Sequence, residues 1–508
     1  MKNTLLLLLL CSFGLGAQQG AAGQIDRSLP EFSFNRHELA GQLYFLASDY
    51  LQGRRTGSVG NEVAAEYIAA QLRAYGYDPI NAADSSYFQE VPLRVVNAPE
   101  RAELTIGGDT YRNGEELLVI RGPEAQASGQ VVFANFGWVD PANDHNDYAN
   151  LDVKGKIVIT RPGIPGDQSQ QAVFRGMEAK AAMAAEAGAA GIFELFTLPF
   201  PWGSFKSYLG GERMTMTEDG SQATIPYGFI RLPDATVASL QSAPGGLSGA
   251  LSSTGMRIRD LGSRNVGGIL RGSNPELADE YVLMTAHFDH VGVGSQGGGY
   301  YSAEDSIFNG ARDNAFGTVS LLAAARAFAQ HPPERSIVVL AVTGEEIGLL
   351  GSKYYAEHPL VPLEQTIFNF NTDGAGYNDT SAVAVIGMGR TGIDPQIEAA
   401  ASAFGASVIA NPAPEQGLFD RSDNVNFAVK GIPALTFSPG MTGFDDTIAK
   451  YYHQVSDNPE TVDLDYLQRY CQIYTLAARL IANRPTAPFW EAGDKYESAG
   501  KERYGLRK

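Results

Sequence analysis

Short apolar runs recur along the second half of the chain, and they alternate with segments whose apolar residues recur at helical spacing. Runs without a charged residue lie at 281–285, 336–342 and 366–371. Helical spacing covers about 315–330 and 349–356. Strands that alternate with helices of this length are typical of βαβ units. We therefore predict an α/β fold with a mixed, mostly parallel sheet flanked by helices, extended by strands at 383–387 and 433–437, a helix at 393–404 and a last helix from 464.

The stretch from 122 to 250 has a different character. It contains the strand-like segments GQVVFANFGW (129–138) and GKIVITRPG (155–163), then an alanine-rich helix, and none of the acidic and histidine clusters described below. We therefore predict that it is an inserted, β-rich α/β domain. Its aromatic segment 197–211 is expected to be either a surface loop or a lid.

The flanking parts, 24–121 and 251–490, are predicted to form one larger domain around this insertion. In the first part, the polar stretch LQGRRTGSVG (51–60) separates two segments with helical spacing and is expected to be an exposed turn or part of a cleft rim. The charged tail 491–508 loses periodicity and is expected to be loosely held.

The first 23 residues have the pattern of a secretory signal peptide, with Lys2, a short apolar core and small residues before a cleavage point. We therefore expect export to the periplasm or the cell exterior. Cleavage would remove Cys11 and leave Cys471 alone, so no intramolecular disulfide is possible. Cys471 is expected to be a small buried side chain in the last helix.

Composition excludes several other classes of protein. The formal charge is −19 and no basic run occurs, which argues against nucleic-acid binding. No stretch after the signal peptide is apolar and long enough to span a bilayer, so no stable membrane insertion is expected. The oligomeric state is left open.

The three charge-free strands each end in groups that bind metals or protons. His287 and Asp289 follow the first strand, Glu345 and Glu346 the second, and Asp373 the third. Because ligands bind beyond the carboxyl ends of strands in open α/β sheets, we expect these side chains to share one site. Taken alone, each has an ordinary explanation as a packed histidine or a solvated acid. Their joint occurrence at successive strand ends indicates a metal site.

The residue types suit a pair of divalent ions. Zinc takes imidazole nitrogen and carboxylate oxygen, and paired ions need a bridging carboxylate. We predict two Zn²⁺ ions, other divalent ions being possible, with Asp313 as the bridge, although an Asp before a helix is more often an N-cap. Glu345 is predicted to be the general base, and Asp289 to orient His287. The complete set of predicted ligands is His287, Asp313, Glu346, Asp373 and His453.

The strings TAHFDHVG, NGARDNAFG, TGEEIGLLGS, FNTDGAG and YYHQVSDNPE resemble those of the secreted M28 family of zinc aminopeptidases. The resemblance implies the same ligands and base, and a role for Tyr452 in stabilising an oxyanion. DVKGKIVITRPG and KAAMAAEAGAAGIFEL, within the insertion, resemble a protease-associated (PA) domain. Arg312, Phe316 and the string RSDN (421–424) depart from the family pattern, and Arg421 is a candidate substrate contact.

The predicted function is therefore a secreted dinuclear zinc aminopeptidase that hydrolyses N-terminal residues from peptides, its expected partners. A glutamate-type carboxypeptidase or dipeptidase on the same ligands is the nearest alternative, and it would need a basic pocket for a terminal carboxylate. A glutaminyl cyclase would keep one metal set. An inactive binding protein would have lost ligands, and none is lost.

Overall fold

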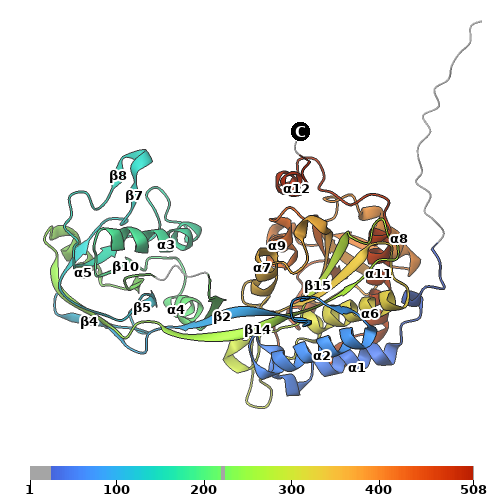
Figure 1. Ribbon diagram of the computed structural model, residues 1–508. Coiled ribbons are helices and arrows are strands. Elements are labelled where there is room, and N and C mark those ends of the chain that lie inside the picture. The colour runs from blue at the N-terminus through green and yellow to red at the C-terminus, as the bar shows by residue number, and fades with distance from the viewer. Residues whose placement is uncertain (1–24, 219–222, 507–508) are drawn as a thin grey trace, which may run out of the picture.

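The computed structural model describes residues 25–218 and 223–506, so the predicted signal peptide, 1–23, lies outside the described residues. These residues form a larger and a smaller body (Figure 1). The long strands β2 (Phe88–Asn97) and β14 (Arg257–Leu270) run between the two bodies and pair antiparallel along their length. No helix in the described ranges has the length and apolarity needed to cross a membrane.

The larger body is built on a ten-stranded mixed sheet, which confirms the predicted mixed α/β class. Its centre is parallel, because β16, β15, β17 and β20 pair with one another in parallel register. Antiparallel pairs flank this centre on both sides, so parallel pairing is less extensive than predicted. The remaining bounds are β1 (Asp78–Pro79), β11 (Arg213–Met216), β15 (Tyr281–His287), β16 (Ser336–Val342), β17 (Thr366–Thr372), β18 (Ala382–Ile386), β19 (Ser407–Ala410) and β20 (Ala434–Pro439).

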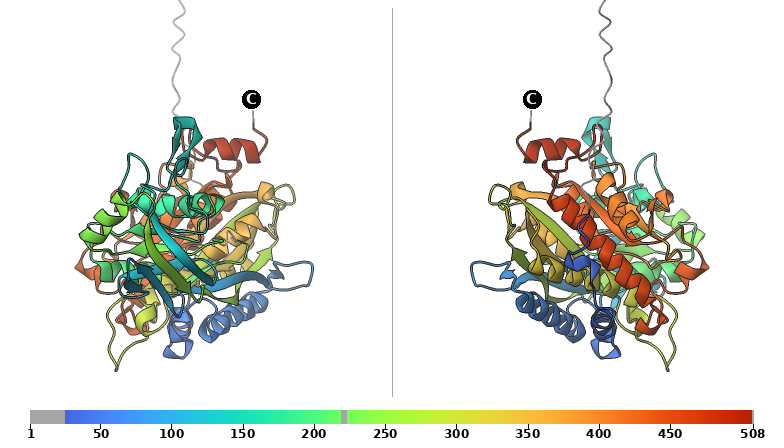
Figure 2. Two further views of the ribbon diagram at one scale, coloured as in Figure 1. Left: turned by 90° about the vertical axis from the view of Figure 1, so that its left-hand side faces the viewer. Right: turned by 90° about the vertical axis from the view of Figure 1, so that its right-hand side faces the viewer.

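The central strands are buried and mostly apolar because helices cover both faces of the sheet. In β15, Val282 and Met284 pack into one core and Leu283 into the core on the opposite face. Figure 2 shows the smaller body in front on the left and the larger body in front on the right. The first core takes residues from α1 (Arg36–Leu46), α2 (Val59–Tyr75), α6 (Phe316–Gln330), α8 (Asp394–Ala403) and α11 (Leu464–Ala482), and the second from α7 (Leu350–Glu357) and α9 (Asn424–Ala428).

The smaller body contains an eight-stranded sheet that starts at Ala102, before the predicted boundary at 122. The earlier start follows from long-range pairing: β3 pairs with β13 and β5 with β12, which local patterning cannot reveal. The assignment of 122–250 as a PA domain remains a prediction. The elements are β3 (Ala102–Ile106), β4 (Asp109–Arg112), β5 (Leu117–Arg121), β6 (Ala125–Phe133), β9 (Ile157–Thr160), β10 (Gly191–Leu195), β12 (Tyr227–Ile230), β13 (Leu247–Ser253), α3 (Gln170–Glu186), α4 (Trp202–Gly210) and α5 (Asp234–Ser242), with the separate pair β7 (Val139–Asp140) and β8 (His145–Asn146).

The aromatic segment 197–211 is neither of the two expected alternatives. It contains α4, whose Trp202 and Phe205 are buried in the core of the smaller body. Aromatic side chains of this size stabilise a domain mainly when they are buried. The segment is therefore part of that body's own core.

The C-terminal tail is also better ordered than expected. It forms α12 (Glu497–Arg503), and the buried ring of Tyr496 packs against Trp490, the residue just before the tail, whose indole donates to the carbonyl of Gly431 at 3.0 Å. The hydroxyl of Tyr504 donates to the carbonyl of Thr366 at 2.6 Å. The expectation of a loosely held tail was wrong because aromatic anchors outweigh the charged residues between them. In the last long helix, Cys471 is buried, as predicted.

The stretch 51–60 was expected to be an exposed turn or a rim, yet half of its residues are buried: Leu51, Gly53, Arg54, Thr56 and Gly60. A Cβ atom on Gly53 would lie 2.3 Å from the carbonyl oxygen of Gly292, so the close approach of the two backbones requires glycine. The next side chain, Arg54, is 1% exposed. Burial of a charged group at this depth requires partners for its donors.

Within the part of the chain that the structure describes, Arg54 donates only to backbone carbonyls, and they come from separate segments. Its acceptors are Phe288 (2.7 Å), Asn309 (2.6 Å), Gly310 (2.9 Å) and, through a shorter contact, Leu46. Burial lowers its pKa to about 10, against the opposing effect of nearby carboxylates, so the guanidinium stays charged at neutral pH. Arg54 thereby joins α1 to the two loops that carry the candidate site.

We expect Arg54→Met to lower the free energy of unfolding by at least about 3 kcal/mol, because several buried carbonyls lose their donor. Urea unfolding followed by circular dichroism measures this change. The control is Arg36→Met, since Arg36 pairs with Asp465 where both side chains are exposed. The control should change stability by less than about 1 kcal/mol. Equal stability of the two variants would show that Arg54 does not hold the loops together.

Candidate metal centre

The candidate site lies at the carboxyl edge of the parallel centre of the sheet. His287 is the last residue of β15, Glu345 and Glu346 follow β16, and Asp373 follows β17. These strands are neighbours in the order β16-β15-β17 and run parallel, so their ends meet at one edge. Asp313 comes from the short turn η5 (Ala311–Ala315) before α6.

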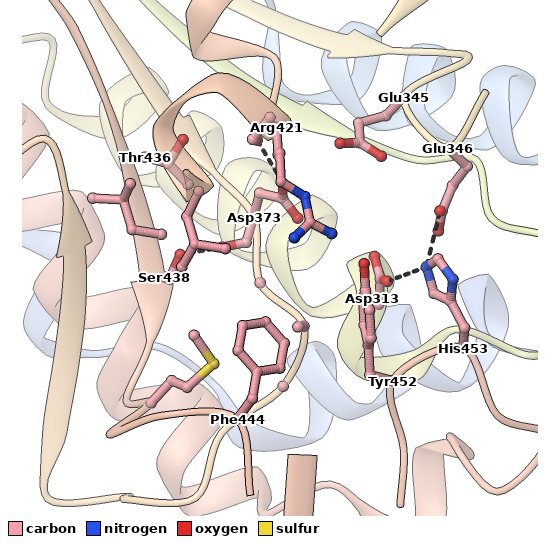
Figure 3. A pocket seen from close by; sticks show the side chains of 17 residues that line it. Asp313, Glu345, Glu346, Asp373, Arg421, Thr436, Ser438, Phe444, Tyr452 and His453 are labelled. Atoms are coloured by element: carbon pink, nitrogen blue, oxygen red, sulfur yellow. Dashed lines mark hydrogen bonds and ion pairs between the residues drawn. The ribbon is translucent and has the colours of Figure 1, made fainter. Parts of the chain in front are cut away.

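His453 reaches the same place from a loop far along the chain. Its imidazole Nε2 lies 3.2 Å from Asp313 Oδ2 and 3.0 Å from Glu346 Oε2. On the other side, His287 Nε2 lies 3.3 Å from Asp313 Oδ1 and 3.1 Å from Asp373 Oδ1. The two oxygens of Asp313 therefore face two different sets of ligand atoms, each with one imidazole and one further carboxylate. Figure 3 shows the set in which His453 contacts Asp313 and Glu346.

Electrostatic coupling among these groups is strong. Burial acts to raise the pKa of Asp313, but hydrogen bonds with His287 and His453 outweigh it and hold the pKa well below its usual range. For His453, burial acts to lower the pKa of the imidazole. The hydrogen bonds and charges of Asp313 and Glu346 outweigh burial and raise this pKa to about 10. The cluster thus has carboxylates that stay ionised and attract positive charge to both of its halves.

The adjacent glutamates have different surroundings. Glu346 contacts His453, whereas Glu345 points away from that ring into the open part of the cavity (Figure 3). Burial raises the pKa of Glu345 well above its ordinary value, and the neighbouring carboxylates of Asp373 and Glu346 raise it further against the effect of His287. Glu345 therefore differs from Asp313 and Glu346, whose pKa values are lowered, and its readier protonation suits a proton carrier.

Asp289 holds the turn that presents the two glutamates. Its carboxylate accepts the backbone N–H of Glu345 at 3.2 Å and that of Glu346 at 3.4 Å, together with the hydroxyl of Thr56 at 2.9 Å. Its carboxylate lies 3.7 Å from Nδ1 of His287, while its own carbonyl lies at 3.3 Å. Asp289 therefore contacts both the glutamate turn, through hydrogen bonds from its N–H groups, and the imidazole that it was predicted to orient.

His290 has a closer contact with the site than the sequence indicated. Its Nδ1 lies 2.7 Å from Glu346 Oε1, and its ring is buried. His290, Asp313 and Glu346 offer ligand atoms within 4.8 Å of one another, as do His287, Glu345 and Asp373. The position of His290 three residues after His287 is the sequence signal that could have placed it at the site. The structure adds that His290 fixes the carboxylate of Glu346.

A cavity of about 80 Å³ opens onto these groups. Tyr452 lines it and stacks on the ring of His453, with 4.2 Å between ring centroids. Burial raises the pKa of Tyr452, so its hydroxyl stays protonated and can donate a hydrogen bond. Arg421 also lines the cavity, and the apolar part of the wall is formed by Ile386, Leu418, Met441 and Phe444.

The donor set fits divalent metal ions. Each oxygen of Asp313 faces an imidazole nitrogen and a second carboxylate oxygen lies nearby, which is the ligand chemistry that zinc prefers. Carboxylates this close together in a buried place need a concentrated positive charge. Two sets of ligands that share one carboxylate can accept a pair of ions.

Comparison with known proteins is consistent with this chemistry. Residues 265–477 match the sequence model of peptidase family M28. The vacuolar membrane protease of Saccharomyces cerevisiae (strain ATCC 204508 / S288c) is 29% identical over 217 residues, which are 41% of this chain and 19% of the relative. The match thus spans about a fifth of that relative's length.

Two bacterial proteins match over most of the chain. Aminopeptidase YwaD of Bacillus subtilis (strain 168) is 25% identical over 460 residues, covering 89% of this chain and 85% of the relative. The structure of an aminopeptidase from Aneurinibacillus sp. strain AM-1 aligns with a TM-score of 0.57 at 21% identity, covering 91% of this chain and 98% of the other, which shows a shared fold. Residues 265–477, about two fifths of this chain, thus match peptidase family M28.

Proposed function

We propose that this chain is an exported aminopeptidase that uses two zinc ions to remove N-terminal residues from peptides. The observation that carries the proposal is the position of Asp313, whose two oxygens face two separate imidazoles at 3.3 and 3.2 Å. The likeness to a relative named as an aminopeptidase over 89% of this chain supports the choice of reaction.

Each half of the site would hold one ion. His287, Asp373 and one oxygen of Asp313 would hold the first, and His453, Glu346 and the other oxygen of Asp313 the second. Bound zinc lowers the pKa of a water molecule and polarises the carbonyl of the bond to be cleaved. The buried contact with His290 would keep the carboxylate of Glu346 in place.

Glu345 would act as the general base. It lines the cavity and is held by the backbone contact of its N–H with Asp289. It would take a proton from the attacking water and pass it to the amine that leaves. Tyr452, protonated at neutral pH, would donate a hydrogen bond to the oxygen that becomes negative during the attack. The free N-terminus of the substrate would lie near the second set of ligands and the adjacent acids.

We expect the purified protein to retain about two zinc ions per chain after dialysis, and Asp313→Ala to retain at most about one. The reason is that the substitution removes the shared ligand from both halves. Metal content by plasma emission spectrometry checks this. Glu304→Ala, which removes an exposed acid outside the cavity, is the control and should keep the full content. Full zinc content in Asp313→Ala would contradict the shared-ligand arrangement.

We expect the zinc-loaded protein to shorten a peptide with a free N-terminus stepwise and to leave its N-acetylated twin intact. Glu345→Gln should lower kcat by about 10²- to 10⁴-fold, because the proton carrier is lost while the metal ligands remain. Mass spectrometry of the digests and the zinc content of the variant together check this.

Other patterns of cleavage would point to other functions. Shortening of both peptides from the carboxyl end would identify a carboxypeptidase. Absence of cleavage by a protein that carries its zinc would refute peptide hydrolysis on these substrates and favour a binding role. Undiminished kcat in Glu345→Gln would exclude Glu345 as the base.

A further inference from the structure

Arg421 is a cation of the cavity that the proposed mechanism leaves unused. It lies at the end of η8 (Leu418–Arg421), and its side chain is exposed and lines the same cavity as Glu345 and Asp373. Figure 3 shows its guanidinium directed into the opening. Among the described residues that line the cavity, Arg421 and His453 are the basic ones.

The neighbours of Arg421 hold its backbone in place. The preceding residue, Asp420, accepts Nζ of Lys495 at 2.8 and 2.9 Å and the hydroxyl of Tyr496 at 3.2 Å. The following residue, Ser422, donates to Oδ2 of the predicted metal ligand Asp373 at 2.5 Å. Arg421 therefore projects from a segment that is anchored on both sides. The anchor on one side, Ser422, contacts the predicted metal ligand Asp373 directly.

Despite this position, Arg421 forms no ion pair with any residue in the ranges 25–218 and 223–506. The other arginine that departs from the family pattern is the opposite case. Arg312 is buried, and its guanidinium pairs with Asp457 at 3.2 Å and lies over the ring of Tyr451 at 3.7 Å. Arg312 is thus occupied by the protein itself, whereas Arg421 has its donors free for a molecule in the cavity.

An exposed arginine is ordinarily a solvated surface residue. Two features set Arg421 apart. It lines the same cavity as Tyr452 and Glu345, which places it near the proposed site of reaction. The cavity carboxylates are the predicted ligands and base, so bound metal would leave the guanidinium without an acidic partner. A planar guanidinium pairs best with a carboxylate, through two parallel hydrogen bonds.

We propose that Arg421 binds a carboxylate of the substrate next to the bond that is cleaved. This inference rests on the proposed function and narrows its substrate class. The carboxylate has two possible sources: the side chain of an N-terminal Glu or Asp, or the free C-terminus of a dipeptide. The apolar wall of Ile386, Leu418, Met441 and Phe444 suits the methylene stem or the uncharged side chain that accompanies it.

The test compares substrates that differ only in the carboxylate. Glu-p-nitroanilide is measured against Gln-p-nitroanilide, and Leu-Gly against Leu-Gly amide, with kcat/KM as the readout. The proteins are the zinc-loaded native chain, Arg421→Met, Arg421→Lys and Arg271→Met. Arg271 is the matched control, because it is exposed, lies outside the cavity and pairs with Asp279, so its substitution removes the same charge elsewhere.

In at least one pair the native chain is expected to prefer the carboxylate substrate by about 10- to 100-fold, the effect of a charge-assisted bidentate contact. Arg421→Met should abolish that preference, Arg421→Lys should keep part of it, and Arg271→Met should keep all of it. The preferred pair identifies the source of the carboxylate.

The proposal is overturned if the native chain shows no preference in either pair, or if the preference survives in Arg421→Met. Failure of the proposed function has a different signature. In that case the native chain with its zinc would hydrolyse none of these substrates, nor Leu-p-nitroanilide, and the inference would fall with it.

Discussion

The structure depends on the concentration of negative charge at one edge of its central sheet. Like charges in a buried place repel and lose hydration, so such a cluster persists only beside compensating positive charge. The protein supplies this charge in two layers, with imidazoles inside the cluster and a fully buried guanidinium behind it. The carboxylates are Asp313, Glu345, Glu346 and Asp373, and the cations are His287, His453 and Arg54. Bound metal would add the remaining charge.

The polar stretch 51–60, near the N-terminus, helps to hold the loops that carry the acidic cluster, which its composition does not indicate. Arg54 joins the loops after β15 and before η5 through their carbonyls, and Thr56 donates to Asp289, which in turn accepts both glutamate N–H groups. A stretch that resembles an ordinary polar turn therefore closes the back of the site. These contacts are made to backbone carbonyls or to the buried carboxylate of Asp289. The positions of the predicted metal ligands therefore depend directly on this N-terminal stretch.

The smaller body is attached by strand pairing. β2 and β14 are shared between the two bodies, and β11, from within the predicted insertion, pairs with β2 at the edge of the larger sheet. Beside β11, Glu212 pairs with Arg55 at 3.1 Å, one residue from the buried Arg54. The cavity is nevertheless lined by residues of the larger body alone, among the residues described.

The sequence by itself determined the parallel centre of the sheet and the strand ends that carry His287, Glu345, Glu346 and Asp373. It could do so because strand periodicity is local, and parallel neighbours place their carboxyl ends together. Only the tertiary structure decided how Asp313 divides its oxygens between two imidazoles, that His290 contacts Glu346, and that Arg54 is buried. The tertiary structure alone also decided that the second sheet starts at Ala102 and that Tyr504 anchors the tail to Thr366. These features join residues far apart in the chain, and the energy of such contacts comes from burial and distance, which no local pattern encodes.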